Sequence, residues 1–563
     1  MGGTRADAET QAVVGPAPSA RPAVRESGPG GRRRLTALLA YLLAGAILFV
    51  VYLRLSETYS LNSDSANILL MGWDLLHGHL LLHGWYSSDV SFYPTELPQY
   101  ALLEGLLGLH MQTAHVAAAM TYTLTFLLAV LLARSGSSGR AAWVRTLVAA
   151  GIMLAPQIGL GVWALDLSVG HIGTSVPLLL IWLLLDRMSP RWYVPLLTAV
   201  LLAWVLVADP ITYVVGIGPL GAVSAAWVIR GLVKGRGRWT RRIADQWYVL
   251  SLGAAAVAAV AIAWVVNNLL TDMGGYVVNR LPFYLTPWHD LNQNAPAAWK
   301  VLQIFGANYA GLSGIWFALA LLHLVSVLGV GWALLRVARR FFSVSLVDQV
   351  LAVAIVLNVL LYLLTNASDE AAHEVAIILP FGAALATRVL IRTASPAQAA
   401  GRDDSQGAAS SRRRRRVRLA AFAAGIVVLA GYTAGLGYEL TQPSAPPANA
   451  SLASWLVAHH LSYGLSGYWT SSSVTVDSGE RVQVRALLLP TLQPDLWMSN
   501  EDWYSPKLHY ANFVVLDSEP GYFSHWEPLP LVRKYFGTPA RTYHTGPYTI
   551  MVWNKNLLDD IPR

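Results

Sequence analysis

The chain contains 563 residues, of which 55% are hydrophobic and only 13% are charged. Soluble domains carry about 25% charged residues, so a series of soluble domains is excluded. The chain has no cysteine, which excludes disulfide bonds, thiolate metal sites and cysteine nucleophiles. Its net charge of +8 would indicate nucleic-acid binding only if the basic residues shared one exposed face.

Residues 1–34 are rich in Ala, Pro, Gly and Arg without periodicity, so we expect a disordered cytoplasmic tail. Eleven apolar runs follow that are long enough, or nearly so, to cross a bilayer core of about 30 Å as helices. They lie at 35–55, 113–133, 146–164, 173–186, 192–208, 211–230, 246–270, 311–335, 346–365, 374–391 and 419–438. Residues 35–438 are therefore predicted to form an all-α polytopic membrane domain.

The basic residues predict the orientation of these spans, because Lys and Arg stay on the cytoplasmic side of short loops. With the N-terminus inside, the cytoplasmic segments hold 29 of the 40 Lys and Arg residues, and the extracytoplasmic loops hold two, Arg280 and Lys300. This favours an N-in, C-out topology, with the bacterial plasma membrane as the expected location. The run Arg412–Arg416 is typical of a topology anchor beside anionic lipid, so no nucleic-acid partner is expected.

The first extracytoplasmic loop, residues 56–112, is the longest connection of the predicted bundle and contains no Lys or Arg. A long connection within a compact body is usually functional. Ser63 or Asp64 can cap a helix whose apolar face would lie on the membrane surface, formed by Ile68, Leu69, Trp73 and Leu76. A carboxylate at a helix N-terminus is favoured in its ionised form, which suits a base, although a plain cap explains Asp64 equally well.

Other ionisable residues fall at the extracytoplasmic ends of later spans, where such groups usually face a cavity or a partner. Asp166 and His171 lie between the third and fourth spans, and Asp209 between the fifth and sixth. The fourth extracytoplasmic loop supplies Arg280 and His289. Arg280 can bind a phosphate through its forked guanidinium, or it can pair structurally with one of the Asp residues.

This arrangement resembles the GT-C glycosyltransferases, polytopic enzymes that use polyprenyl-phosphate-linked sugars. The resemblance rests on the long first loop with Asp64 directly after the first span, the eleven helices and a C-terminal α+β domain. It implies that Asp64 is the catalytic base and that Asp166 is the second acidic residue of the family, on the next extracytoplasmic loop. Family members often have paired acids in the first loop, whereas Ser65 and Ala66 follow Asp64 here.

The resemblance implies an inverting transfer of a sugar from a polyprenyl-phosphate donor to the hydroxyl of a glycan, lipid or protein acceptor. Asp64 would deprotonate that hydroxyl. His171, Asp209, Arg280, His289 and, from the first loop, Asp89 are the candidate substrate-binding residues. No cofactor is predicted with certainty, but a divalent cation at Asp64 and Asp166 is kept as an alternative. A metal cluster of His77, His79 and His83 is the weaker alternative, because interfacial histidines usually make simple polar contacts.

After residue 438 the composition changes, and residues 445–563 predict an extracytoplasmic α+β domain. We expect a helix in LASWLVAHHLSYG that ends at Gly464, and two strands within 473–489 around a Ser-Gly turn. Further strands are expected in ANFVVLD and PYTIMVW. Two other functions stay open: a transporter, disfavoured because the polar residues collect at one membrane face, and a non-catalytic scaffold whose outer domain binds a partner.

Overall fold

The computed structural model describes residues 30–154, 165, 170–234, 246–369, 372–391, 408–517 and 528–562. The chain divides into two compact units, residues 1–47 and 48–563. The described part of the first unit is the beginning of helix α1 (Gly30–Ser56), five residues earlier than the predicted span. Its leucine side chains from Leu35 to Leu43 are exposed, as expected of a helix surface that faces lipid. Residues 1–29 of the predicted tail lie outside the described residues.

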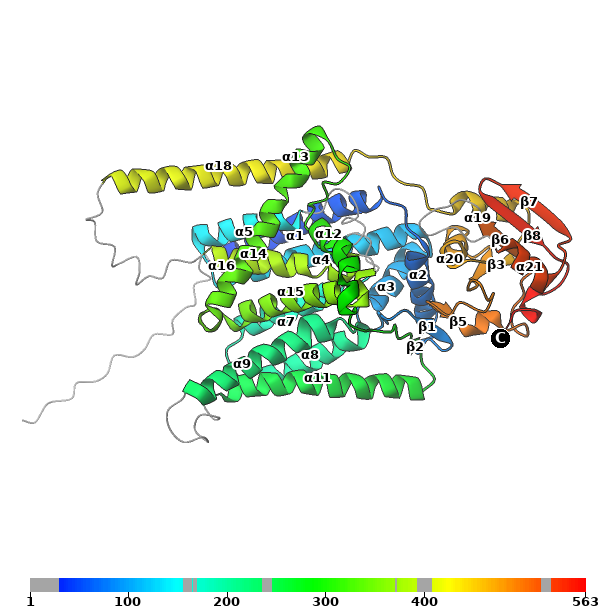
Figure 1. Cartoon of the computed structure of the whole chain (residues 1–563), viewed down its shortest axis with the longest axis horizontal. Helices are drawn as coiled ribbons and strands as arrows, with labels where there is room; N and C mark the ends of the chain where they lie inside the picture. The colour runs from blue at the N-terminus through cyan, green and yellow to red at the C-terminus, as the bar shows by residue number, and fades with distance from the viewer. Residues whose placement is uncertain are drawn as a thin grey trace, which may run out of the picture. The chain divides into compact units, whose positions relative to one another are not determined.

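A helix lies at each of the eleven predicted spans (Figure 1). After α1 these helices are α4 (Met111–Arg134), α5 (Gly139–Met153), α7 (Ser175–Arg187), α8 (Tyr193–Ala208), η1 (Tyr213–Ile217) with α9 (Gly218–Lys234), α11 (Trp247–Asp272), α13 (Gly314–Leu322) with α14 (Leu324–Arg339), α15 (Leu346–Leu364), α16 (Ile378–Leu390) and α18 (Ala408–Glu439). Within the described ranges, eight helices are long and apolar enough to cross a membrane, when η1 with α9, α13 with α14, and residues 372–377 with α16 are each counted as one helix. The other three, α5, α7 and α8, have 15, 13 and 16 residues.

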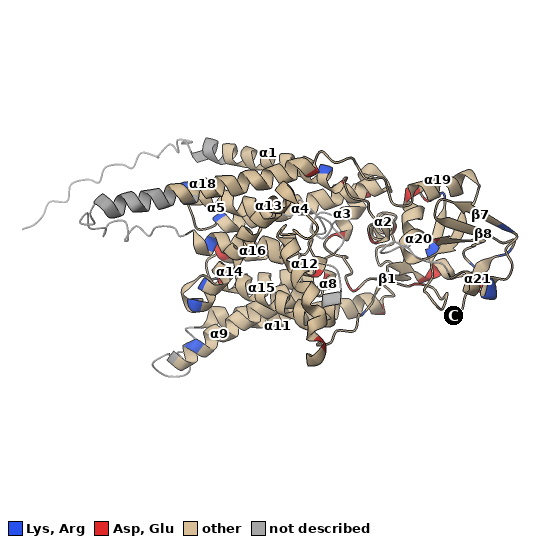
Figure 2. Ribbon diagram, turned by 45° about the horizontal axis from the view of Figure 1, so that its top comes forward, with Lys and Arg blue, Asp and Glu red and all other residues tan. Residues whose placement is uncertain are grey.

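Figure 2 shows basic residues gathered at the end of the bundle that lies away from the C-terminal strands, where α5, α9 and α14 carry blue segments. At this end Arg388 of α16 is almost buried and contacts two carboxylates, Asp186 at 2.7 Å and Asp348 at 2.5 Å. Arg145 of α5 donates to the backbone carbonyls of Ser135, Arg388 and Ile391. These charges are tolerated inside an apolar bundle because each has hydrogen-bond partners.

Residues 56–112 form two helices and a short strand, α2 (Ser63–Leu76), β1 (Trp85–Ser87) and α3 (Leu97–Leu107). The N-cap of α2 is Asn62, whose side chain accepts from the Asp64 amide at 3.0 Å, so the predicted capping by Ser63 or Asp64 is wrong. The predicted membrane-facing surface is also wrong in part. Ile68 and Leu69 are fully buried, in a core that the 56–112 segment shares with Tyr276, Val476 and Met498.

Short elements join this segment to the rest of the chain. Strand β1 pairs in parallel with β2 (Val277–Val278) and antiparallel with β5 (Ser499–Asn500). The remaining elements of the bundle are η2 (Trp288–Asn294), α12 (Ala295–Ile304), η3 (Phe341–Ser343), η4 (Asn366–Asp369) and η5 (Ala372–Val375). Strand pairing and a common core thus connect the first loop, the loop after α11 and the C-terminal domain.

The C-terminal part is an α+β domain with a five-stranded sheet of order β4-β3-β6-β8-β7. Its strands besides β5 are β3 (Tyr463–Ser466), β4 (Gln483–Ala486), β6 (Phe513–Asp517), β7 (Arg541–Thr545) and β8 (Tyr548–Val552). Its helices are α19 (Ala450–Ala458), α20 (Tyr468–Asp477), η6 (Glu501–Tyr504), α21 (Leu529–Phe536) and η7 (Leu557–Asp559). Strands β3, β4 and β6 are parallel, and the β6, β8 and β7 pairs are antiparallel.

The predicted strands in ANFVVLD and PYTIMVW are confirmed as β6 and β8, and the second of the two strands expected within 473–489 is confirmed as β4. Two other expectations are wrong. The first predicted helix ends at Ala458, and Gly464 lies inside strand β3. Residues 473–477 are helical, because α20 is buried on almost every side and packing outweighs the strand preference of its Val and Thr residues. The predicted fold class, a polytopic helical membrane domain followed by an α+β domain, is confirmed.

Candidate active site

Asp64 lies in the first turn of α2, where the dipole of that helix favours its ionised form. The hydroxyl of Tyr468, at the start of α20, donates to Asp64 Oδ1 at 2.6 Å. Burial raises the pKa of Asp64 above its ordinary value, while the hydrogen bond from Tyr468 and the nearby His373 act in the opposite direction. The carboxylate therefore has the raised proton affinity of a base and a fixed orientation.

A buried histidine, His171, lies between two carboxylates, and its ring is near that of His373, which acts electrostatically on Asp64. His171 Nδ1 is 2.9 Å from Asp209 Oδ2, and His171 Nε2 is 3.1 Å from Glu374 Oε2. The hydroxyl of Thr174 and the amide of Ile211 also donate to Asp209. Burial alone would lower the pKa of His171, but the two carboxylates raise it well above its ordinary value. The two carboxylates therefore favour the imidazolium form of His171 and hold its ring in place.

Two further residues, His373 and Asp89, belong to this group. His373 Nε2 is 3.3 Å from Glu374 Oε1, and the rings of His171 and His373 are 6.0 Å apart. Burial raises the pKa of Asp89; His171 acts against this rise, while Glu374 and Asp209 add to it. Asp89 therefore lies within electrostatic range of this group. We call Asp64, Asp89, His171, Asp209, His373 and Glu374 the acidic cluster.

Glycines allow the chain to approach the acidic cluster closely. Gly170 has a φ of +133°, and a Cβ atom there would lie 3.0 Å from Cβ of His373, so both its backbone angle and the space require glycine. A Cβ on Gly173 would overlap the carboxyl group of Glu96. Glu96 is 4% exposed, and burial raises its pKa to about 7. Its carboxyl group thus lies against the loop that carries His171.

The structure brings together four of the seven predicted site residues: Asp64, Asp89, His171 and Asp209. Asp166 lies outside the described residues. Arg280 is exposed and follows β2, where Asn279 donates to the carbonyl of Ser87 at 2.6 Å. The side chain of His289 is 81% exposed and contacts Asp290 at 3.1 Å.

The described residues do not form a metal site. No group of three or more His, Asp or Glu side chains within the described ranges is arranged to hold an ion. His171 uses both nitrogens on carboxylates. The three histidines of the predicted metal cluster have separate partners: His77 bonds the carbonyl of Trp73, His79 lies 3.6 Å from Asp74, and His83 bonds the carbonyl of Gly274.

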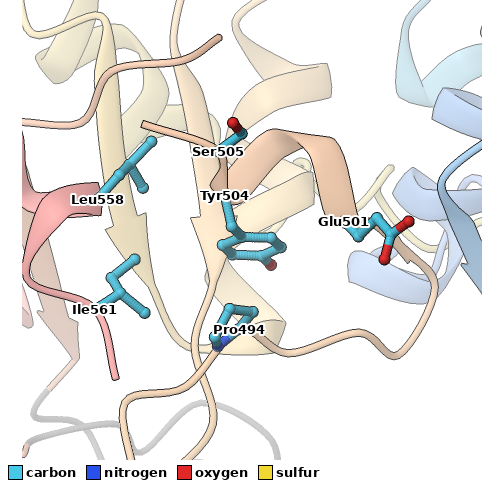
Figure 3. Close-up of a pocket in the computed structure, with 6 residues that line it drawn as sticks. All are labelled: Pro494, Glu501, Tyr504, Ser505, Leu558 and Ile561. Atoms are coloured by element: carbon cyan, nitrogen blue, oxygen red, sulfur yellow. The ribbon is translucent and has the colours of Figure 1, made fainter. Parts of the chain in front are cut away.

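A separate pocket of about 270 Å³ lies in the C-terminal domain (Figure 3). Its walls are formed by Pro494, Glu501, Tyr504, Ser505, Leu558 and Ile561. None of the residues of the acidic cluster lines this pocket. It therefore contributes nothing to the geometry around Asp64.

Three residues at or near this site were not predicted as site residues. Glu374 and His373 come from the AAHEVAIILP segment, where a His-Glu pair at the start of an apolar run was the available signal. Tyr468 lies 404 residues after Asp64, and no local pattern marks it. Its YGLSGYWTSS segment indicates either a binding surface or a domain core.

Comparisons with known proteins agree with this architecture. Neither the scan against protein-family models nor the search of curated protein sequences gives a match. Among solved structures, ArnT from Cupriavidus metallidurans bound to undecaprenyl phosphate matches with 11% identity and a TM-score of 0.53. The same ArnT in the apo state matches with 12% identity and a TM-score of 0.55. Each match covers 92% of this chain and 98% of the other.

The Archaeoglobus fulgidus oligosaccharyltransferase in complex with Zn and sulfate matches with 13% identity, over 92% of this chain and 74% of its own, at a TM-score of 0.47. The similarity to ArnT extends over the helical bundle and the C-terminal domain together, because nearly all of both chains is aligned. This chain therefore has the GT-C fold.

Proposed function

We propose that this protein is a membrane glycosyltransferase that transfers a pentose or hexose from a polyprenyl-phosphate donor to an acceptor hydroxyl, with inversion, on the extracytoplasmic side of a bacterial plasma membrane. The observation that carries the proposal is the position of Asp64. This carboxylate follows the first span directly, has a pKa raised by burial and belongs to the acidic cluster of a chain with the GT-C fold. The acceptor is a glycan, a lipid or a protein.

In the proposed reaction, Asp64 takes the proton of the acceptor hydroxyl while its oxygen attacks the anomeric carbon. The bond between that carbon and the phosphate oxygen breaks, and the polyprenyl phosphate leaves with the electron pair. One displacement inverts the anomeric configuration. The guanidinium of Arg280 is the proposed counter-charge for the leaving phosphate, while His171, whose two nitrogens are bonded to Asp209 and Glu374, contributes positive charge without a free donor. Asp89, Asp209 and Asp166 are proposed to orient the sugar or these cations.

The apolar bundle supports a lipid-linked donor. Exposed leucine, valine and tryptophan side chains cover α8, α11 and α14, so a polyprenyl chain can lie against them while its phosphate stays at the membrane boundary. The ArnT structure with undecaprenyl phosphate supports a donor of this kind. Figure 2 supports the orientation, because basic residues gather at the opposite end of the bundle, which would face the cytoplasm.

The test is an Asp64→Asn variant, assayed in membranes against a panel of polyprenyl-phosphate pentoses and hexoses. We expect at least a 100-fold loss of sugar transfer, since removing a positioned general base typically costs about 10²- to 10⁴-fold. The matched control is Glu57→Gln on the same segment, whose carboxylate accepts from Gln112 at 2.7 Å and lies outside the acidic cluster. Normal transfer by a folded Asp64→Asn variant would contradict the proposal and favour a scaffold.

A further inference from the structure

We propose that the C-terminal domain completes the active site, with Tyr468 as the positioning residue that holds the carboxylate of Asp64. This inference rests on the proposed function, because it assigns a partner to the proposed base. It gives the C-terminal domain a direct part in the reaction, rather than only the binding of an acceptor.

The hydrogen bond between Tyr468 and Asp64 belongs to a short chain of hydrogen bonds that also includes Asn67. The Tyr468 hydroxyl donates to Asp64 Oδ1 at 2.6 Å and accepts from Asn67 Nδ2 at 3.1 Å. Asp64 and Asn67 are three residues apart in α2, so their side chains lie on the same face of that helix. Because Asn67 uses its amide as the donor, the phenol is directed to give its own proton to the carboxylate.

The position of Tyr468 is set by the C-terminal domain. Its backbone carbonyl accepts from Ser471 Oγ at 3.0 Å, and its ring packs edge-on against Trp469 at 4.9 Å. The residue begins α20, whose Thr475 bonds the backbone of Val484 in β4. Tyr468 is therefore attached to the five-stranded sheet, and it reaches Asp64 only while the domain is docked.

The docking itself rests on two further connections. Val476 of α20 and Met498 lie in the same buried core as Ile68 and Leu69 of α2. In addition, β5 of the domain pairs with β1 of the 56–112 segment, and Asn500 donates to the carbonyl of His83 at 3.1 Å. These contacts keep α20 against α2, so the phenol and the carboxylate meet without a flexible linker.

The hydrogen bond has a chemical consequence for a base. A phenol that donates to an ionised carboxylate stabilises that ion and fixes its plane. With Oδ1 held by Tyr468, the remaining oxygen is directed to the acceptor hydroxyl. Without the phenol, only His373 and Asn62 still favour ionisation against the effect of burial, so a larger fraction of Asp64 is protonated at a given pH. The base is then lost at higher pH than in the wild type.

The experiment compares Tyr468→Phe with wild type in the same polyprenyl-phosphate sugar assay, from about pH 5 to pH 9. We expect kcat to fall about 10- to 100-fold, as for loss of a hydrogen bond to a charged group, with little change in KM for the donor. We also expect the acidic limb of the pH profile to move to higher pH. Tyr510→Phe is the control, since that ring is 45% exposed and contacts Tyr463.

A milder variant tests the same contact in case Tyr468→Phe does not fold. Asn67→Ala keeps the phenol but removes its donor, so we expect a smaller change in the same direction, with a melting temperature near that of wild type. Wild-type kcat and an unshifted pH profile for Tyr468→Phe would overturn the inference. A lower kcat with an unshifted acidic limb would also overturn it, because Tyr468 would then only attach the domain.

Asp64→Asn separates this inference from the proposed function. An inactive Asp64→Asn variant together with a wild-type pH profile for Tyr468→Phe contradicts the inference alone. An active Asp64→Asn variant contradicts both. The melting temperatures of Asp64→Asn, Tyr468→Phe and the double variant test the contact between Asp64 and Tyr468 without any substrate. We expect the two shifts in melting temperature to be non-additive, and additive shifts would show that the two side chains do not interact.

Discussion

Glu104 of α3 is a carboxyl group in an unfavourable place. It is 2% exposed, and neither of its oxygens has a hydrogen-bond partner among the described residues. Burial, with a smaller effect from Glu480, raises its pKa from 4.5 to about 9. Glu104 is therefore protonated at neutral pH, unlike the ion pair of His171 with Asp209 and Glu374.

The pKa of Glu104 is 4.5 in the unfolded state and about 9 in the folded state, so the unfolded state binds fewer protons between these two pH values. The free energy of unfolding therefore falls as pH rises from about 4.5 through about 9. Each pKa unit corresponds to about 1.4 kcal/mol. We expect Glu104→Gln to remove this loss, so that the gain in melting temperature over wild type grows with pH. Glu480→Gln should have a smaller effect, and identical curves for Glu104→Gln and wild type would contradict the assignment.

Individual site residues differed in how far the sequence could predict them. Asp64, His171 and Asp209 could be found because ionisable groups are rare at the ends of apolar spans. Glu374 has the same signal, but it is the first residue of a predicted span, so the sequence indicates only that it belongs to that helix. Tyr468 could not be predicted, since its contact depends on how an α+β domain packs against α2.

At the scale of the elements, Arg388 joins three helices at the end of the bundle away from Asp64. Its guanidinium contacts Asp186 of α7 and Asp348 of α15. Arg388→Met would leave two nearly buried carboxylates unpaired, which typically costs about 3–5 kcal/mol. We expect a large fall in melting temperature in detergent. Arg336→Met, which removes a 3.4 Å hydrogen bond to the carbonyl of Val389, should cost far less. Equal melting temperatures for the two variants would contradict this account.

Strand β3 depends on a glycine that faces an aromatic ring. Gly464 pairs with Phe513 of β6, and a Cβ atom on Gly464 would lie 2.0 Å from Cε2 of that ring. Phe513 is fully buried and cannot move aside without opening the sheet core. We therefore expect Gly464→Ala to expose the C-terminal domain to proteolysis. Gly437→Ala in α18, where nothing lies within 4 Å, is the control.

Element type was predictable where a single periodic signal was strong. Long apolar runs gave a helix at every predicted span, because a bilayer-length run has few alternatives. Short segments in the C-terminal domain were less certain. The Val and Thr residues at 473–477 favour a strand by composition, yet they form the buried part of α20. Strand β7 was missed because its five residues are exposed or half-buried and do not show the alternation of a half-buried strand.

The two ends of the helical bundle are expected to face opposite sides of the membrane. Since the chain contains no cysteine, single cysteines can be introduced and labelled in intact cells with a membrane-impermeant thiol reagent. We expect Lys507→Cys, exposed on the C-terminal domain, to be labelled. Arg140→Cys, exposed at the start of α5, should react only after the membrane is permeabilised. The reverse pattern would place Asp64 in the cytoplasm.

In the proposed function, the acidic cluster that contains Asp64 catalyses sugar transfer from a lipid phosphate. The most direct measurement is the release of polyprenyl phosphate when purified protein in lipid nanodiscs is given polyprenyl-phosphate pentoses and hexoses, together with a cell-envelope extract as acceptor. We expect release with at least one donor by the wild-type protein and none by Asp64→Asn. Equal release by both proteins, or none from any donor by folded wild-type protein, would contradict the claim.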